Sequence, residues 1–223
     1  MNNVLLYRIW FCVVLKRRNK KLKLPIISDY LYFDGYPRSG NTFTIGLIER
    51  IYPSLKGKGS HHLHSVAGLK IALKHNLKVL IIIRVPQDAI VSYLYTKRET
   101  KSEKSNLIDN LIIQYIDYYN FVFKSINKIK IINFDKMIKN EKVVMENFGD
   151  WISLNSEGNI NDIILDYKGR MKNFQKVQNI EHSSMPNAER KMFKSENIDI
   201  VKNSIYYDKA ISIHNKIIAL SGL

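Results

Sequence analysis

The stretch YFDGYPRSGNTFTIGLIER, from Tyr32 to Arg50, decides the fold. The apolar run Tyr30–Phe33 predicts a short buried strand, and Gly35 and Pro37 end it in a tight loop. After the loop, apolar side chains recur at helical spacing, at Phe43, Leu47, Ile48 and Ile51. The sequence therefore predicts a strand, a glycine loop and a helix in succession.

The rest of the chain continues this alternation of strands and helices. Lys78–Arg84 reads KVLIIIR, which is β-branched and apolar on both faces, as in a parallel strand covered by helices. Pro86 opens a helix that we expect to run to about Arg98. Further elements are expected as a helix at Asn106–Phe123, a strand at Lys128–Phe134 with a helix to about Ile152, a short helix at MPNAERKMF, and a helix at Ile205–Leu220. The pattern predicts an α/β domain with a mainly parallel sheet.

Composition indicates one globular domain. The chain has 223 residues, of which 45% are hydrophobic and 25% charged, values that exclude wholesale disorder. Its single cysteine, Cys12, excludes an internal disulfide framework and fits a reducing compartment. We expect a basic segment over residues 1–24 and a single domain over residues 25–223.

Positive charge is concentrated near the N-terminus. The net charge is +15, and seven basic residues precede the first acid, Asp29, which leaves +8 (15 minus 7) for the remainder. Such a balance indicates polyanionic or acidic partners, although a lysine-rich background composition would give the same count. The apolar run Val4–Leu15 is too short to span a bilayer, and its charges follow it, unlike those of a signal peptide. We expect an N-terminal helix packed on the domain of a cytoplasmic protein, with peripheral membrane contact through residues 4–24 as the alternative.

The loop Gly35–Thr42 nearly matches the phosphate-binding pattern GxxxxGK[ST], but Asn41 stands where the lysine belongs. A glycine turn before a helix presents several backbone N–H groups to one anion, and the helix dipole adds to the field. Ser39 and Thr42 would add hydroxyl groups, and Arg38 is the remaining cation. The alternative interpretation is a structural turn after a strand.

A second segment, RVPQDAIVSYLY, places Arg84 at a strand end and Ser92 eight residues later on the next helix. Because eight residues are a little over two helical turns, both side chains could reach one phosphate. The alternative is a surface arginine and a solvent-facing serine that have no common ligand.

Together the two segments resemble those of sulfotransferases that use 3′-phosphoadenosine 5′-phosphosulfate (PAPS). YPRSGNTF is similar to that family's phosphosulfate loop, Y-P-K-S-G-T-T-W, and RVPQDAIVSYLY is similar to its 3′-phosphate segment, R-x-P-x-D-x-x-x-S-x-Y. The resemblance implies a P-loop-like, three-layer α/β/α fold around a mainly parallel sheet. It also implies transfer of a sulfuryl group from PAPS to an acceptor hydroxyl, of which a carbohydrate is one candidate, without a metal.

The resemblance carries over to single positions. Arg38 falls where soluble members have the lysine that contacts the sulfate and its bridging oxygen. Arg84 and Ser92 would bind the 3′-phosphate. The residues implied for the 5′-phosphate loop are Ser39, Gly40, Asn41 and Thr42, followed by Phe43 in place of a tryptophan.

Catalysis needs a base for the acceptor hydroxyl, and GSHHLHSVAGLKIAL supplies His61, His62 and His64. The family often has a K-T-H base segment at this place, and His62, followed by Leu63, best matches its His-Leu sequence, so the resemblance implies that His62 is the base. Two of these histidines could instead pack or cap the next helix. A histidine metal site is a further alternative, but no carboxylate or thiol lies nearby in sequence.

The resemblance fails towards the C-terminus. YKGRMKNF (Tyr167–Phe174) only faintly echoes the family's R-K-G-x-x-G-x-W-K segment. HSSMPNAERKMF offers Ser183, Ser184 and Arg190 as replacements, with Arg190 as the cation.

Two other function classes stay open at this point. A P-loop kinase or NTPase would need a magnesium-holding acid after a strand, for which Asp135 is the candidate. A non-enzymatic module would bind a membrane or nucleic acid through the basic cluster between Arg8 and Lys23. A sulfotransferase fold that has lost its activity is a third possibility. The sequence specifies neither the acceptor nor the oligomeric state.

Overall fold

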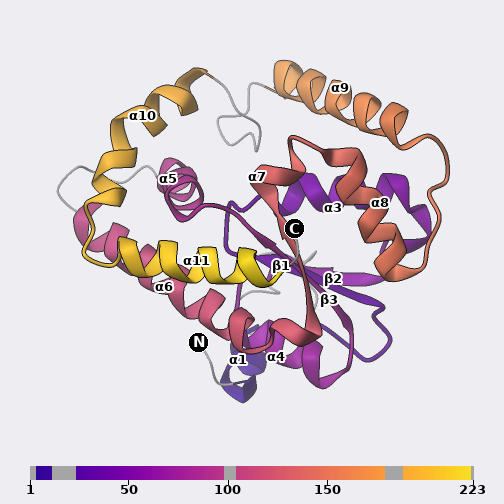
Figure 1. The fold of residues 1–223 in the computed structure, drawn as a ribbon, viewed down its shortest axis with the longest axis horizontal. Helices are drawn as coiled ribbons and strands as arrows, with labels where there is room; N and C mark the ends of the chain where they lie inside the picture. Colours follow the sequence, from indigo (N-terminus) through magenta and orange to yellow (C-terminus); the bar gives the residue numbers. More distant parts are fainter. Residues whose placement is uncertain (1–3, 12–23, 98–103, 179–187, 222–223) are drawn as a thin grey trace.

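The structure is a computed structural model that describes residues 4–11, 24–97, 104–178 and 188–221 (Figure 1). Four parallel strands form its sheet in the order β2-β1-β3-β4. Their bounds are β1 Leu31–Gly35, β2 Gly59–His61, β3 Lys78–Ile83 and β4 Ile129–Asn133. The predicted α/β fold with a mainly parallel sheet is confirmed.

Alternate strand residues face two separate apolar cores, which makes the fold three-layered. On one face, strand residues such as Tyr32 and Ile81 pack under α4 (Val66–Lys74), α5 (Pro86–Lys97), α6 (Lys104–Lys124) and α11 (Tyr207–Leu220). On the other, residues such as Phe33 and Ile82 pack under α3 (Asn41–Ile51), α8 (Glu141–Ile152) and α9 (Ile160–Gln178). Burial on both faces explains why β3 is apolar throughout.

Several element boundaries differ from those predicted. The single helix expected after β4 is two helices, α7 (Phe134–Met137) and α8, because the chain turns at residues 138–140 and Asn140, with φ −142°, is not helical. The Asn133 side chain caps the start of α7 by accepting from the N–H groups of Asp135 and Lys136. The helix expected at MPNAERKMF is the longer α10 (Ala188–Lys202). Strand β2 and helices α4 and α9 were not predicted. Short 3₁₀ turns lie at Pro53–Leu55 and Ile126–Lys128.

The N-terminal helix α1 (Val4–Trp10) packs on α4. Tyr7 is 1% exposed and forms a small apolar cluster with Ala67 and Ile71. Cys12 and the basic residues from Lys16 to Lys23 lie outside the described residues. Across the described ranges, every helix is too short or too polar to traverse a bilayer.

Helix α10 lies across α5, near the carboxyl edge of the sheet (Figure 1). Lys194 of α10 pairs with both carboxylate oxygens of Asp88 on α5, at 2.8 and 2.9 Å. Tyr207 at the start of α11 donates to Gln87 Oε1 at 2.8 Å. These contacts bring the C-terminal third of the chain to the end of β3 where Arg84 lies.

Candidate active site

The loop between β1 and α3 needs glycine at position 40. Gly40 has φ 97°, in the left-handed region, and a Cβ there would lie 2.2 Å from ring carbons of Phe134. Its carbonyl accepts from the N–H and the hydroxyl of Thr44, at 3.0 and 3.1 Å, which starts α3. The first N–H groups of α3 therefore face the space beside this loop, as an anion site at a helix N-terminus requires.

Asn41 braces the loop with its side chain. Its amide nitrogen donates to the carbonyls of Tyr36, at 3.2 Å, and Gly35, at 3.5 Å, and the residue is 4% exposed. An inward-facing amide cannot do the work of a P-loop lysine, so only the backbone of Asn41 is available to a phosphate.

Tyr119 on α6 is a site residue that sequence reasoning missed. Its hydroxyl donates to Ile82 O at 2.7 Å and accepts from the N–H of Tyr36 at 3.3 Å. Ser39 Oγ lies 3.4 Å from the same hydroxyl and is fully buried. Because Tyr119 stands among other apolar residues of one long helix, its sequence context gives no signal of this role.

The structure brings Arg38, Arg84 and Ser92 together at the end of the loop. Arg38 Nε donates to Ser92 Oγ at 3.3 Å, and Arg84 Nη1 donates to the carbonyl of Arg38 at 3.1 Å. Burial, together with the charges of Arg190 and Arg84, lowers the pKa of Arg38 to about 10. The two sequence segments, 46 residues apart at this contact, thus meet at one point.

Arg190 joins this cluster from α10. Its guanidinium lies over the ring of Tyr95 on α5, 4.8 Å from the ring centre. Burial lowers the pKa of Arg190, and the charge of Arg84 acts in the same direction. Ser183 and Ser184, the other two C-terminal candidates, lie outside the described residues. We call Arg38, Arg84 and Arg190 the arginine cluster.

Two carboxylates partly balance this cluster, and both lie beside Arg84. Its Nη2 is 3.7 Å from Asp88 Oδ2, and its Nε is 4.0 Å from Asp135 Oδ1. Asp135 Oδ2 also accepts the N–H of Val85 at 3.2 Å, so the acid that an NTPase would need for magnesium is committed to the β3–α5 junction. Among the described residues, no acid pairs with Arg38. Arg38 is therefore the cation best placed for an anionic ligand.

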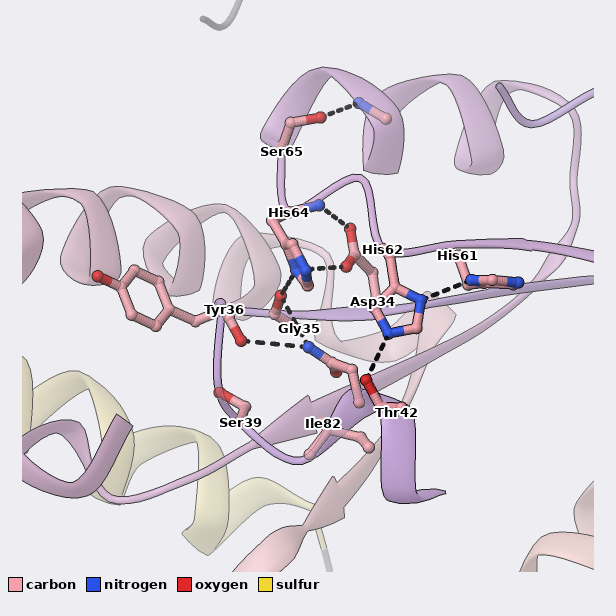
Figure 2. Close-up of polar contacts among 12 residues, drawn as sticks. Asp34, Gly35, Tyr36, Ser39, Thr42, His61, His62, His64, Ser65 and Ile82 are labelled. Atoms are coloured by element: carbon pink, nitrogen blue, oxygen red, sulfur yellow. Dashed lines mark hydrogen bonds and ion pairs between the residues drawn. The ribbon is translucent and has the colours of Figure 1, made fainter. Parts of the chain in front are cut away.

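The histidine segment lies beside Thr42, in the first turn of α3 (Figure 2). His61 ends β2, and His62 follows with φ 59°. His62 Nε2 is 3.2 Å from the hydroxyl of Thr42, in the first turn of α3. His62 Nδ1 is 2.6 Å from His61 Nδ1. Burial, with the neighbouring His64 and His61, lowers the pKa of His62 to about 4, so its imidazole is neutral near pH 7 and has a lone pair to accept a proton.

Asp34, in β1, holds His64 in place. Its backbone N–H donates to Asp34 Oδ2 at 2.8 Å, and its Nδ1 lies 3.0 Å from Asp34 Oδ1 and 2.7 Å from the carbonyl of Gly35 (Figure 2). Burial alone would lower the pKa of His64, but the fully buried Asp34 carboxylate outweighs it and raises that pKa. His64 is thus an anchored side chain, and the buried aspartate that anchors it was not predicted.

Neither a protein-family model nor a curated protein matches the sequence. Among solved structures, the chain is similar to mouse sulfotransferase SULT7A1 complexed with PAP, with a TM-score of 0.52 and 12% sequence identity. The match covers 85% of this chain and 90% of that chain. The fold is sulfotransferase-like. At this identity the likeness concerns the fold, and the fold implied by the sequence resemblance is confirmed to that extent.

In this sulfotransferase-like fold, Phe43 lies in an aromatic group on α3. Its ring centre is 5.3 Å from that of Tyr167 and 6.5 Å from that of Phe134. Tyr167 belongs to YKGRMKNF, which is part of α9 packed on α3. Two of the three basic residues of that segment are paired, Lys168 with Glu141 and Arg170 with Asp166, and the third, Lys172, is exposed. YKGRMKNF therefore packs against α3, and most of its positive charge is compensated locally.

No three histidine, cysteine, aspartate or glutamate side chains among the described residues are grouped so that they could hold a metal ion. The nearest arrangement is the histidine segment itself, where one ring faces Asp34 and the other two face each other.

Proposed function

We propose that the protein is a sulfotransferase that transfers a sulfuryl group from PAPS to an acceptor hydroxyl. The observation that carries the proposal is the convergence of Arg38, Arg84 and Ser92 beside a glycine loop in a sulfotransferase-like fold. A donor phosphorylated at both ends of its ribose needs two anion sites side by side. The loop with the first N–H groups of α3 would be one, and the arginine cluster with Ser92 the other.

In this proposal the donor is held mainly by fixed charges. Backbone N–H groups of residues 39–42 would bind the 5′-phosphate, and Arg84 with Ser92 the 3′-phosphate, supported by Arg190. Arg38 belongs to the loop and its Nε donates to Ser92, so its side chain would join these two positions. Phe43 offers a half-buried aromatic ring near the loop. Like charges in the cluster repel one another in the protein alone, so a dianionic phosphate among them would be bound strongly.

The proposed reaction is an in-line displacement at sulfur. His62 Nε2 removes the proton of the acceptor hydroxyl, and the oxygen forms a bond to sulfur. The bond from sulfur to the bridging oxygen breaks, and its electron pair leaves with adenosine 3′,5′-bisphosphate. Arg38 and the loop N–H groups would stabilise the charge that develops on the sulfuryl and bridging oxygens. Burial keeps the imidazole of His62 neutral near pH 7, the form that accepts a proton, and its lowered pKa also makes it a weaker base than a free imidazole.

The acceptor class belongs to the same proposal. A net charge of +15 favours an acidic acceptor such as a glycan, since the protein's field would attract it. The test is a screen of carbohydrate, lipid and phenol acceptors with PAPS that carries labelled sulfate. We expect label to reach one acceptor class with the wild-type protein and not with His62→Ala. Absence of transfer to every acceptor, together with no binding of the bisphosphate, would contradict the proposal.

A further inference from the structure

We propose that His61 is a positioning residue that sets the tautomer of His62 and receives the proton that His62 releases from Nδ1. The chemical step of this proposal rests on the proposed function, whereas the hydrogen-bonded histidine pair itself does not. The relay runs from the acceptor hydroxyl to His62 Nε2, and from His62 Nδ1 to His61 Nδ1. We call His61 and His62 the histidine pair.

The contact between the two rings requires opposite roles for their nitrogens. His61 Nδ1 and His62 Nδ1 are 2.6 Å apart, so one must carry a hydrogen and the other a lone pair. If His62 donates, its Nε2 keeps a lone pair and faces Thr42 Oγ1 at 3.2 Å, where a hydroxyl can donate to it. The reverse assignment would put a hydrogen on His62 Nε2 and prevent it from acting as a base. The proposal therefore assigns the donor hydrogen to His62.

The backbone is shaped to make this contact. Successive side chains of an extended strand point to opposite faces, so neighbouring rings normally do not meet. His61 is the last residue of β2, paired with Phe33, and the left-handed φ of 59° at His62 ends the extended conformation there. The two ring centres lie 4.7 Å apart with an angle of 81° between the rings (Figure 2). A left-handed conformation at a non-glycine residue costs free energy and is often found at functional sites.

Surrounding charges favour the positive charge on His61 over His62. Burial lowers the pKa of both rings, His64 disfavours positive charge on both, and the Asp34 carboxylate favours it on both. The carboxylate of Glu49 favours the charged form of His61 in addition. The positive charge of Arg38, in the loop, opposes the rise in the pKa of His64. Moving the proton from His62 to His61 therefore carries the charge towards Glu49 and away from the His64 side.

Each bond that breaks in the proposed step is matched by one that forms. The acceptor O–H bond breaks as its oxygen bonds to sulfur, and that proton binds His62 Nε2. The His62 Nδ1–H bond breaks and its proton binds His61 Nδ1, which leaves His62 neutral and His61 as imidazolium. The electron pair of the broken bond to sulfur leaves with the bisphosphate. After the products leave, His62 Nε2 releases its proton to water and the proton on His61 Nδ1 returns to His62 Nδ1, which restores both starting tautomers.

The kinetic test compares His61→Phe, which removes both nitrogens, with His61→Asn, which retains an acceptor oxygen but cannot take the proton. We expect His61→Phe to lower kcat for sulfate transfer at least tenfold, with KM for PAPS and Kd for the bisphosphate unchanged, and added imidazole to restore part of the rate. His61→Asn should keep the hydrogen on His62 Nδ1, and its kcat should lie between those of the wild type and His61→Phe. His75→Phe, the same change at the end of α4, is the matched control. Wild-type kcat in His61→Phe would overturn the proposal.

Nitrogen NMR of the histidine side chains gives a second readout that needs no enzymatic activity. In wild type and His61→Asn we expect hydrogen on His62 Nδ1 and a bare Nε2, and in His61→Phe a mixture of both tautomers. Hydrogen on His62 Nε2 in the wild type would overturn the proposal even if transfer occurs. If no acceptor is sulfated but the NMR assignment holds, the proposed function fails and the histidine pair stands as described.

Discussion

At the scale of single residues, Asn41 decides how the glycine loop is interpreted. Its side chain is turned into the loop and bonded to the carbonyls of Gly35 and Tyr36. The Asn41 side chain therefore stabilises the loop and provides no positive charge. The positive charge comes instead from Arg38, three residues earlier, which has no acidic partner among the described residues. The loop thus differs from that of P-loop NTPases in the residue that supplies its positive charge.

The first prediction concerns the close approach at Gly40. Gly40→Ala should lower the free energy of unfolding by about 2–4 kcal/mol, because the left-handed φ and the contact with Phe134 add up. Gly57→Ala, where φ is 72° and nothing lies within 4 Å of the added Cβ, should cost only about 1 kcal/mol. Urea denaturation measures both. Equal losses in the two variants would mean that Phe134 does not constrain the loop.

The second prediction concerns the two differently held histidines. In an NMR titration, His62 should change charge near pH 4 and His64 above the ordinary histidine value of about 6.5. A raised pKa means that His64 stabilises the fold fully below the unfolded-state pKa and that this contribution is lost as the pH rises through the folded-state pKa. His64→Asn should therefore destabilise the protein more at about pH 6 than at about pH 9. A variant with the opposite pH dependence would refute the role given to Asp34.

At the scale of elements, α10 completes the site from the far end of the chain. Asp88 on α5 is shared between Lys194 of α10 and Arg84 at the end of β3. The ring of Tyr95, one turn after Ser92 on α5, lies under the guanidinium of Arg190. Helix α5 therefore links the strand-end arginine to the C-terminal arginine.

The third prediction is that Arg190→Ala weakens binding of adenosine 3′,5′-bisphosphate about tenfold without changing the thermal unfolding midpoint by more than a few degrees. One charge-assisted hydrogen bond contributes about 1.5–3 kcal/mol, of which part is offset by relief of repulsion within the arginine cluster. Lys191→Ala, an exposed neighbour on α10, is the matched control. If both variants bind equally well, α10 takes no part in the site.

The elements that sequence predicted well are those with a strong local signal. β1, β3 and the helix after Pro86 have continuous or periodic apolar patterns bounded by glycine or proline. β2 has three residues, Gly59–His61, and its strand conformation depends on pairing with β1, which no local pattern reveals. The helix after β4 is interrupted at residues 138–140, where Asn140 has φ −142°, and no glycine or proline marks this break in the sequence.

The site residues likewise divide into those that a local sequence pattern identifies and those that only the fold identifies. Arg38, Arg84 and Ser92 were predicted together because each lies at a strand end or on the following helix, and parallel strands end at one edge of the sheet. Their supports were not predicted. Tyr119, Tyr115 and Asp34 act through hydrogen bonds to residues distant in sequence, such as Tyr115 to Arg84 O at 2.8 Å. Only the folded arrangement identifies those partners.

At the scale of the whole molecule, three distant parts of the chain supply positive charge to one place. Arg38 comes from the first strand–helix unit, Arg84 from the sheet centre and Arg190 from the C-terminal third. In the proposed reaction these fixed guanidinium groups would perform the charge stabilisation that magnesium performs in kinases. The fold brings the three cations together at the carboxyl edge of the sheet.

The fourth prediction follows from these fixed cations. Sulfate transfer should proceed at the same rate with excess EDTA as with added magnesium, because the arginine cluster and the loop N–H groups already provide positive charge at the donor. The measurement is the initial rate of label transfer under both conditions. Loss of transfer in EDTA that magnesium restores would favour the kinase or NTPase interpretation.

The most direct test of the central claim is calorimetric titration of adenosine 3′,5′-bisphosphate into the wild-type protein and into the Arg84→Ala/Ser92→Ala pair. The account predicts one site per chain in the wild type and an affinity at least about a hundredfold lower in the pair, since charged hydrogen bonds to one phosphate are lost. Arg170→Ala, which removes an exposed arginine paired with Asp166, should bind as the wild type does. No binding by the wild type, or undiminished binding by the Arg84→Ala/Ser92→Ala pair, would contradict it.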